Sequence, residues 1–574
     1  MWTTVLTVAA SLASLPGVEA FNNPAGVDIW CGKAYRSSNT SFNPGGWFEQ
    51  PSYSSTPLLD LKVRPRMSIY LESDTTGSLL VDTAVSHLTG DPLPILPSTA
   101  ADSKQPIHLT IDILTSNGTS VASITNNTLT LDTTNNDIPL PFDSLHLTPQ
   151  RTPYTITTTV SLPNTTTTFT TSTDLYYLPQ RTDGGSATRI DHLHGGLSYL
   201  RGEDTTWTPI FPFTYYVQWS LYWDTSPATL STFSSMGYNV IHIVPTGSLS
   251  DTPFPWANFT PYLDLADTSN LHLQYDVLWE PSNLTEMIDQ VTHIHTHPSL
   301  LLYYTGDEPD GKSDPLNSTL IAYNTLKELD PYHPVSLALN CRDFYYEEYA
   351  AGADIILSDV YPIATNTSWS TVYETPCNAT YGCCGCDDCT GEFADISDRI
   401  EEFRAFDQII GWEKTHWGAP QAFGNETFWT RYPTSEEEVV MVLLSVNHGA
   451  MGIVMWDFPS STGIEEVTGE LSRVIGGDAE VVEFLVGGER AAVKAGSGVD
   501  VAVWVDGGKA LVSVVCLEYD GVEGDVVVEV PGNGTVKEVV KALWGSSEWE
   551  VTGGKLVKQG LSGLEVDVFV VEVV

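Results

Sequence analysis

The sequence predicts a multidomain protein in which a central (β/α)8 barrel of the TIM type lies between two antiparallel β-sandwiches. Three observations predict this fold class. Short β-type runs separated by turn residues fill the stretch from Leu58 to about Leu178, strand-like and helix-like segments alternate from Phe211 to Phe458, and β-type runs with glycine-rich turns return from about Val481. Strict alternation is typical of a parallel α/β fold, whereas short strands without a helical period indicate antiparallel sandwiches.

Eight strand-like segments occupy the central stretch, and eight β/α units in about 250 residues is the size of a TIM barrel. The last helical segment, Ser435–His448, has Ser435 as a predicted N-cap and Glu438 three residues on, the pattern of a capping box. We expect a signal peptide over residues 1–20, an N-terminal sandwich over 21–190, the barrel over 191–475 and a C-terminal sandwich over 476–574. The expected barrel strands are Tyr215–Tyr222, Val240–Pro245, Leu271–Leu278, Leu300–Gly306, Val335–Asn340, Asp354–Tyr361, His416–Gly424 and Gly452–Phe458.

The first residues and the sequons predict a secreted protein. Met1–Ala20 contains an apolar stretch that ends in the small-residue pattern Val18-Glu19-Ala20, as in a signal peptide. No later apolar run is long enough to span a bilayer. The density of Asn-x-Ser/Thr sequons then indicates a glycosylated eukaryotic product. The sequons begin at Asn39, Asn117, Asn126, Asn164, Asn258, Asn283, Asn317, Asn366, Asn378, Asn425 and Asn533.

The cysteines predict disulfides rather than a metal site. Five of the eight lie in one short stretch, and the adjacent Cys383-Cys384 pair fits tetrahedral zinc spacing poorly. In an oxidising compartment, a disulfide-stapled loop is the favoured reading, with its connectivity left open. This insertion follows the sixth strand, so we expect it to wall one side of a cleft at the carboxyl ends of the strands. The eight cysteines are Cys31, Cys341, Cys377, Cys383, Cys384, Cys386, Cys389 and Cys516.

Composition narrows the classes of partner. The formal net charge of −47 argues against nucleic acid and anionic membranes, because phosphate binding needs a basic surface. Dinucleotide and Gly-x-Ser-x-Gly motifs do not occur, and we expect no cofactor. The cluster His293, His295 and His297 precedes the fourth strand, at the base of the barrel, and is read as a helix end rather than a metal site. We expect a monomer.

The fourth predicted strand carries the strongest functional signal. The apolar run Leu300–Gly306 ends abruptly in Asp307-Glu308-Pro309-Asp310. Parallel barrels carry out their chemistry at the carboxyl ends of their strands, so these acids should lie at the mouth. We expect Pro309 to hold Glu308 in an extended conformation. The alternative is a strand followed by a solvated acidic turn.

Other strand ends add acids, amides and aromatic rings to the same rim. Carboxylates suit acid–base chemistry on a sugar, flat rings suit pyranose faces and amides suit hydroxyl groups. Each residue also has a plainer explanation, since Asp359 could cap a helix and Trp456 could fill the barrel. We therefore expect a polysaccharide or oligosaccharide as partner. We take Glu308, Asp359 and Asp307 as candidate catalytic residues. The candidate substrate-binding residues are Asp310, Gln218, Trp219, Trp223, Tyr361, Gln421, Trp456 and Asp457.

From Arg189 to Phe458 the chain resembles secreted TIM-barrel glycoside hydrolases of the large retaining clan, and the resemblance implies a fungal source. The segments that carry the resemblance are "GDEPDG", "LKELDPYHPV", "DIILSDVYPI", "QAFG…RYPTSEEE" and "GAMGIVMWDF". The resemblance implies that Glu308 is the acid/base residue at the end of strand four. It also implies a nucleophilic Glu at the end of strand seven, where this chain instead reads Gln421-Ala-Phe-Gly.

Three catalytic arrangements remain open at the level of the sequence. Glu308 could act as acid with Asp359 as base, which suits inversion because the two strands have one strand between them. Asp307 and Glu308 could assist attack by an acetamido group of the substrate itself, as adjacent Asp-Glu pairs do in hexosaminidases. Asp457 or Glu426 could serve as nucleophile. The alternatives to a hydrolase are a carbohydrate-binding protein on a degenerate barrel and a transglycosidase.

Overall fold

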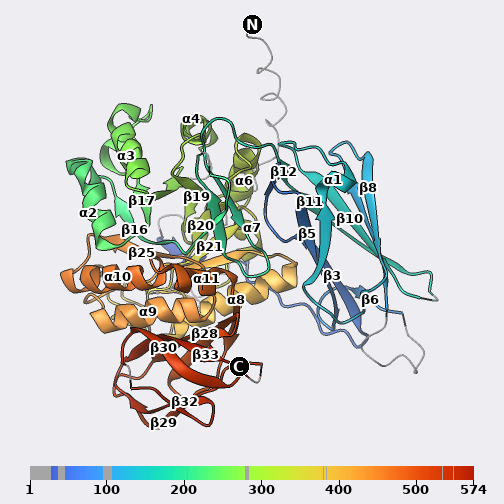
Figure 1. The fold of residues 1–574 in the computed structure, drawn as a ribbon. Helices are drawn as coiled ribbons and strands as arrows, with labels where there is room; N and C mark the ends of the chain where they lie inside the picture. Colours follow the sequence, from blue (N-terminus) through green and yellow to red (C-terminus); the bar gives the residue numbers. More distant parts are fainter. Residues whose placement is uncertain are drawn as a thin grey trace.

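The computed structural model describes residues 27–35, 45–94, 106–163, 165–202, 204–277, 283–378, 381–382, 384–532, 534–546 and 548–574. Figure 1 shows the barrel beside a β-sandwich formed by the earlier part of the chain and above a second one formed by the last part. The predicted signal peptide lies outside the described residues, as do Cys383 and the sequons at Asn39, Asn164 and Asn533. No helix among the described residues combines the length and the hydropathy needed to cross a membrane.

The eight predicted barrel strands are confirmed. They pair in parallel in sequence order, and β25 returns to β16 to close the barrel. Most of these strands are buried on both faces, which explains why they read as continuous apolar runs rather than alternating ones. The strands are β16 (Phe213–Gln218), β17 (Val240–Val244), β18 (His272–Asp276), β19 (Leu300–Asp307), β20 (Val335–Leu339), β21 (Ile355–Ser358), β24 (Thr415–Gly418) and β25 (Ile453–Phe458).

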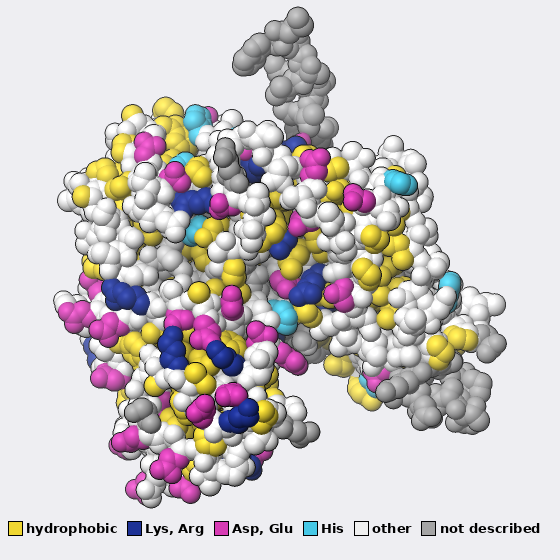
Figure 2. Space-filling view, in the orientation of Figure 1, with side chains coloured by type: hydrophobic (Ala, Val, Ile, Leu, Met, Phe, Trp, Pro, Cys, Tyr) yellow, Lys and Arg dark blue, Asp and Glu magenta, His cyan; other side chains and the backbone are white. Residues whose placement is uncertain are grey.

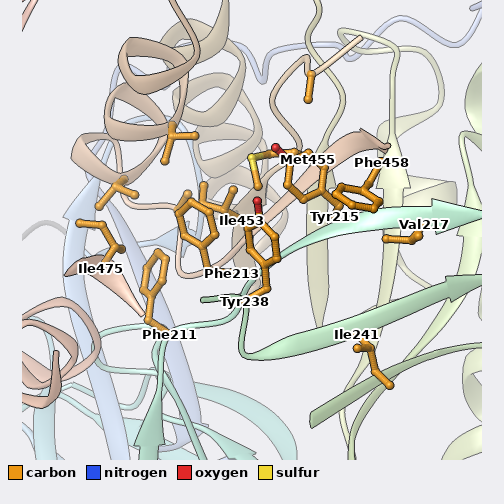
Figure 3. Packing of buried hydrophobic residues seen from close by; sticks show 14 of the residues in the cluster. Phe211, Phe213, Tyr215, Val217, Tyr238, Ile241, Ile453, Met455, Phe458 and Ile475 are labelled. Atoms are coloured by element: carbon orange, nitrogen blue, oxygen red, sulfur yellow. The ribbon is translucent and has the colours of Figure 1, made fainter. Parts of the chain in front are cut away.

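Helices cover the outside of the barrel. Figure 3 shows apolar side chains at the seam between β16 and β25, where Phe213, Tyr215 and Met455 point into one cluster. Such packing between strands and covering helices fixes the barrel wall, so the strand ends become rigid platforms for side chains. The helices are α2 (Ala228–Met236), α3 (Trp256–Thr268), α4 (Leu284–Ile294), α5 (Pro309–Lys312), α6 (Ser318–Leu329), α7 (Tyr346–Ala350), α8 (Ala394–Ile410), α9 (Ser435–Asn447) and α10 (Thr462–Ile475).

The N-terminal sandwich has two four-stranded antiparallel sheets, in the orders β6-β3-β5-β9 and β11-β10-β7-β8. Alternate residues point inward, as in β10, whose burial alternates strictly, and they form one apolar core between the sheets. The strands are β3 (Leu58–Pro65), β5 (Thr76–Ser86), β6 (Asp91–Pro92), β7 (His108–Leu114), β8 (Ser120–Asn126), β9 (Asn136–Pro141), β10 (Tyr154–Ser161) and β11 (Thr168–Leu175). Short elements β4 (Tyr70–Leu71), α1 (Phe142–Leu145), β12 (Tyr177–Leu178), β13 (Ala187–Ile190), β14 (Leu197–Leu200) and β15 (Thr208–Ile210) complete this part.

The C-terminal sandwich packs against the barrel helices through one sheet. Trp504 and Val568, on the outer face of the five-stranded sheet β26-β27-β28-β33-β30, join the core cluster that contains α9. The sequence predicts β-type runs from about Val481, but the structure has a further helix there, α11 (Ala479–Gly487), which packs on the same sheet. Acidic side chains gather over this lower part of the molecule (Figure 2). The strands are β26 (Glu489–Ala492), β27 (Val499–Asp506), β28 (Lys509–Cys516), β29 (Val522–Val528), β30 (Val536–Trp544), β31 (Glu550–Thr552), β32 (Lys555–Leu561) and β33 (Val566–Val573).

Three disulfides match the expectation from the cysteine pattern. Cys377–Cys384 and Cys386–Cys389 staple the insertion after β21, which also contains β22 (Trp369–Ser370) and β23 (Thr375–Pro376). Cys31–Cys341 joins residues 310 positions apart and ties the first described segment, with β1 (Ile29–Trp30) and β2 (Lys33–Ala34), to the end of β20. Cys516 is free and buried.

The N-terminus of α9 differs by one residue from the sequence prediction. Thr434, not Ser435, is the N-cap, and Glu437, not Glu438, completes the capping box. Thr434 has the extended backbone that an N-cap needs, so the register of the box is set there. Glu437 also binds Arg431 and accepts a hydrogen bond from Tyr519 at 2.6 Å, which links the barrel to the C-terminal sandwich. Because the capping box starts one residue earlier than predicted, the side chain of Glu438 lies in the apolar core.

Replacing Glu438 by methionine should stabilise the protein. Glu438 is fully buried, neither carboxyl oxygen has a hydrogen-bond partner among the described residues, and burial raises its pKa well above the ordinary value. The folded state therefore keeps a proton that the unfolded state releases above about pH 4.3, so the cost of Glu438 grows as pH rises. For Glu438→Met we expect a gain of about 2 kcal/mol in unfolding free energy at pH 7 and a smaller gain at pH 4. Urea unfolding at both pH values measures the change in unfolding free energy, and Glu436→Met, at an exposed position of the same helix, is the control. A lower unfolding free energy for Glu438→Met at pH 7 would contradict this explanation.

Candidate active site

A cavity of about 640 Å³ opens at the carboxyl end of the barrel. Five of the sequence-predicted site residues line it together: Asp307, Glu308, Asp359, Tyr361 and Trp456. Its other lining residues are Val27, Asp28, Ile29, Trp30, Tyr35, Asn340, Tyr373, Gly385, Phe423, Glu426, Phe428 and Trp429. Carboxyl groups and aromatic rings thus make up most of the surface that a ligand would meet.

Glu308 sits at the junction of β19 and the short helix α5. Its backbone is left-handed, with φ 52° and ψ 49°, so the prediction of an extended conformation is wrong. The Glu308 N–H donates to the carbonyl of Ala338 on β20, and Pro309 starts α5 directly afterwards, which together require a sharp turn at Glu308. A left-handed glutamate is energetically unfavourable, and such strain is typical of functional sites.

Glu308 and Asp359 form an electrostatically coupled pair. Burial raises the pKa of Glu308 to about 8, with a further contribution from the charge of Asp307. Burial also raises the pKa of Asp359 well above its ordinary value, and the charge of Glu308 is the next largest cause. Asp359 is 3% exposed, and its Oδ1 has no hydrogen-bond partner among the described residues. Because each charge opposes the other, the pair retains a proton at neutral pH.

Asp307 is held in a different environment from Glu308. Its Oδ1 accepts a hydrogen bond from Tyr304 at 3.0 Å, and its Oδ2 forms an ion pair with Lys312 at 3.2 Å. Tyr304 in turn accepts from Tyr216 inside the barrel at 3.0 Å. Tyr304 and Lys312 therefore fix the position of the Asp307 carboxyl group beside Glu308.

Asn340, at the end of β20, is the central residue that the sequence analysis did not select. Its side chain hydrogen-bonds Glu308, its Nδ2 donates to the carbonyl of Asp359 at 3.2 Å, and its Oδ1 accepts from Trp30 Nε1 at 2.7 Å. The rule that pointed to the ends of strands four and six also covers strand five, so Asn340 could have been found. Trp30 could not, because the disulfide that brings it there joins distant parts of the chain.

Replacing Trp30 by phenylalanine should disturb the acid pair without removing a ring from the cavity. The Trp30 N–H fixes which end of the Asn340 amide faces the carboxyl groups, and the Asn340 hydrogen bond lowers the pKa of Glu308. For Trp30→Phe we expect kcat/KM to fall about fivefold, the value of one hydrogen bond, and its alkaline limb to move to higher pH. The control variant Trp369→Phe, at an exposed ring in the insertion, should change neither kcat/KM nor its alkaline limb. An unchanged pH profile in Trp30→Phe would show that Trp30 does not position Asn340.

Several predicted site residues lie behind the cavity rather than in its lining. Trp219 and Trp223 are buried in the packing of β16 with the first helices, and their N–H groups donate to Ser248 and to the Val217 carbonyl. Gln421 is fully buried, where it exchanges hydrogen bonds with the backbone of Ile363. A strand end places a residue at the mouth of the barrel but does not decide which way its side chain points.

Asp310, Gln218 and Asp457 support the rim. Asp310 accepts the backbone N–H groups of Asn340 and Cys341, which fixes the start of that loop, and burial raises the pKa of Asp310 to about 6. Gln218 donates to Asp457 at 3.3 Å across the β16–β25 seam. Burial raises the pKa of Asp457 to about 6, and the charge of Glu426 adds to this. All three lie outside the cavity lining.

No protein-family model matches the sequence, and no curated protein matches it. Solved structures with a related chain path include a family 30 endoxylanase from Clostridium papyrosolvens, at 11% identity and TM-score 0.38 over 63% of this chain and 96% of that one. They also include an Anoxybacillus α-amylase, at 10% identity and TM-score 0.40 over 60% and 89%. A Parabacteroides merdae β-glucuronidase matches at 12% identity and TM-score 0.30 over 90% and 74%. The function is therefore inferred from the residues that line the cavity.

The aromatic side of the cavity comes from three separate segments. Tyr35 stacks on Tyr373 of the insertion with ring centroids 4.0 Å apart, and Phe428 lies 6.1 Å from Tyr373. Trp429 packs edge-on against Phe423 at 4.7 Å. The insertion therefore walls one side of the cavity as expected, through Tyr373 and Gly385. Glu426, beside Phe428, is the lining carboxylate from the loop after β24.

Possible metal ligands are accounted for by other interactions. Among the described residues, Cys31, Cys341 and Asp387 are close enough to share an ion, but the two cysteines are disulfide-bonded to each other. His293 and His295 hydrogen-bond to carbonyls of their own helix, and His297 accepts from the N–H of Ser299. These side chains have structural roles.

Proposed function

We propose that the protein is a secreted glycoside hydrolase in which Glu308 and Asp359 form the acid–base pair. The observation that carries the proposal is a coupled carboxyl pair with raised pKa values in a cavity lined by aromatic rings. A carboxyl group that keeps its proton at neutral pH can protonate a glycosidic oxygen, and its partner can accept a proton from water.

Glu308 is assigned as the proton donor because its side chain is partly open to the cavity. Asp359 directly follows β21, which is separated from β19 by one strand, and parallel strands lie about 4.8 Å apart. That separation leaves room for a water molecule on the opposite face of the sugar and supports inversion. Gln421 stands where a strand-seven nucleophile would be expected, and its amide is engaged by backbone groups.

The test is release of reducing sugar from a panel of cell-wall polysaccharides and oligosaccharides, by the wild type and by Glu308→Gln. Proton NMR of the first product formed would show its anomeric configuration. We expect hydrolysis by the wild type with inversion. Hydrolysis with retention of the anomeric configuration would instead assign Glu426 or Asp457 as the nucleophile that acts with Glu308. Absence of hydrolysis with retained glycan binding would favour the carbohydrate-binding alternative.

A further inference from the structure

The cavity combines several acids with a continuous set of aromatic rings. Its described lining contains five carboxyl groups, from Asp28, Asp307, Glu308, Asp359 and Glu426, and no Lys, Arg or His. Eight of the lining residues are aromatic: Trp30, Tyr35, Tyr361, Tyr373, Phe423, Phe428, Trp429 and Trp456. A ligand in this cavity would thus meet ring faces and negative charge.

Three cations on segments that adjoin the cavity are already paired with carboxylates. Lys312 forms an ion pair with Asp307 at 3.2 Å. Lys33 is buried between Asp387 and Asp388, at 2.6 and 2.8 Å, on the outer side of the first segment. Arg342 is paired with Glu402. None of these three charges remains to receive a carboxylate or sulfate group of a substrate.

Resting on the proposed function, we infer that this site accepts glycans whose rings are uncharged along the cleft and rejects uronic-acid and sulfated sugars. The aromatic rings offer apolar faces that suit the C–H faces of any pyranose, so they provide affinity without selecting charge. The carboxyl groups supply the selection. An anionic ring would lie beside Glu426 and the Glu308–Asp359 pair, and no cation among the described lining residues would offset its charge. Like charges in such proximity strongly oppose binding.

The experiment compares matched neutral and anionic oligosaccharides at pH 6.5. Suitable pairs are cello-oligosaccharides with and without oxidation at C6, xylo-oligosaccharides with and without glucuronic acid branches, and methyl-esterified against free oligogalacturonides. Hydrolysis is measured with the wild type, and binding to Glu308→Gln is measured by calorimetry. We expect the neutral member of a recognised pair to be preferred about a hundredfold, or about 2.7 kcal/mol. The preference should shrink as salt screens the charges.

Glu426→Gln sharpens the test because Glu426 is an exposed lining carboxylate. The Glu426→Gln change should reduce the preference for neutral over anionic oligosaccharides severalfold. The control variant Glu466→Gln, at an exposed site on α10 with the same change in charge, should leave this preference unchanged. Equal or better handling of the anionic members would overturn the inference and leave the proposed hydrolase intact. If no member is hydrolysed, the proposed function fails and the binding data still decide: neutral-selective binding supports the inference, and binding of anionic members or of none overturns it.

Discussion

Glu308→Gln should lower kcat/KM on natural glycans by a factor of about a hundred or more, the usual contribution of one acid–base group. Glutamine keeps the size of the side chain and its contact with Asn340 but has no proton to give to the leaving oxygen. KM should change little, because the aromatic rings that would bind the sugar are untouched.

A change of leaving group separates loss of the acid from general damage. An aryl glycoside whose phenol leaves without protonation does not need Glu308 for bond cleavage. The variant should therefore keep most of its activity on such a substrate while it fails on the glycan. Equal losses on both substrates would assign Glu308 a role other than acid, and no loss on either would remove it from the mechanism. Glu466→Gln is the matched control.

Asp359→Asn should cause a loss of similar size, at least about a hundredfold, that an activated leaving group does not rescue. A base that accepts a proton from water is needed whatever the leaving group. The same change removes a like charge beside Glu308, so the pKa of Glu308 should fall and the alkaline limb of the pH profile should move to lower pH.

The pH profile measured on residual activity checks this coupling. A limb that stays near pH 8 in Asp359→Asn would show that the two carboxyl groups titrate independently. If the activated substrate restored the activity of Asp359→Asn but not that of Glu308→Gln, Asp359 would be the proton donor and Glu308 the base.

The sequence predicts the fold well because the information is local. Buried parallel strands such as Leu300–Asp307 read as apolar runs, and each ends where polar residues begin. The same rule placed Glu308, Asp359 and Tyr361 around one cavity, because parallel strands end at the same side of a barrel. The rule also applies to Asn340, which follows the fifth strand.

The remainder of the site depends on interactions that sequence does not show. Trp219 and Trp223 lie near the mouth, but packing turns them into the core. Trp30 and Tyr35 reach the cavity because Cys31 pairs with Cys341 across 310 residues, and this pairing cannot be deduced from cysteine spacing. The left-handed turn at Glu308 overrides the extended preference of a residue before proline, because the contact with β20 and the start of α5 fix it.

Titration of the Glu308 carboxyl group tests the central claim most directly, since it needs no substrate. With glutamate labelled at the carboxyl carbon, the NMR signal missing from Glu308→Gln belongs to this residue, and its shift can be followed from pH 3 to pH 10. We expect Glu308 to keep its proton through neutral pH and to lose it near the pKa of about 8. A signal that titrates near the ordinary glutamate value of about 4.3 would show that Glu308 is ionised at neutral pH and is not the acid.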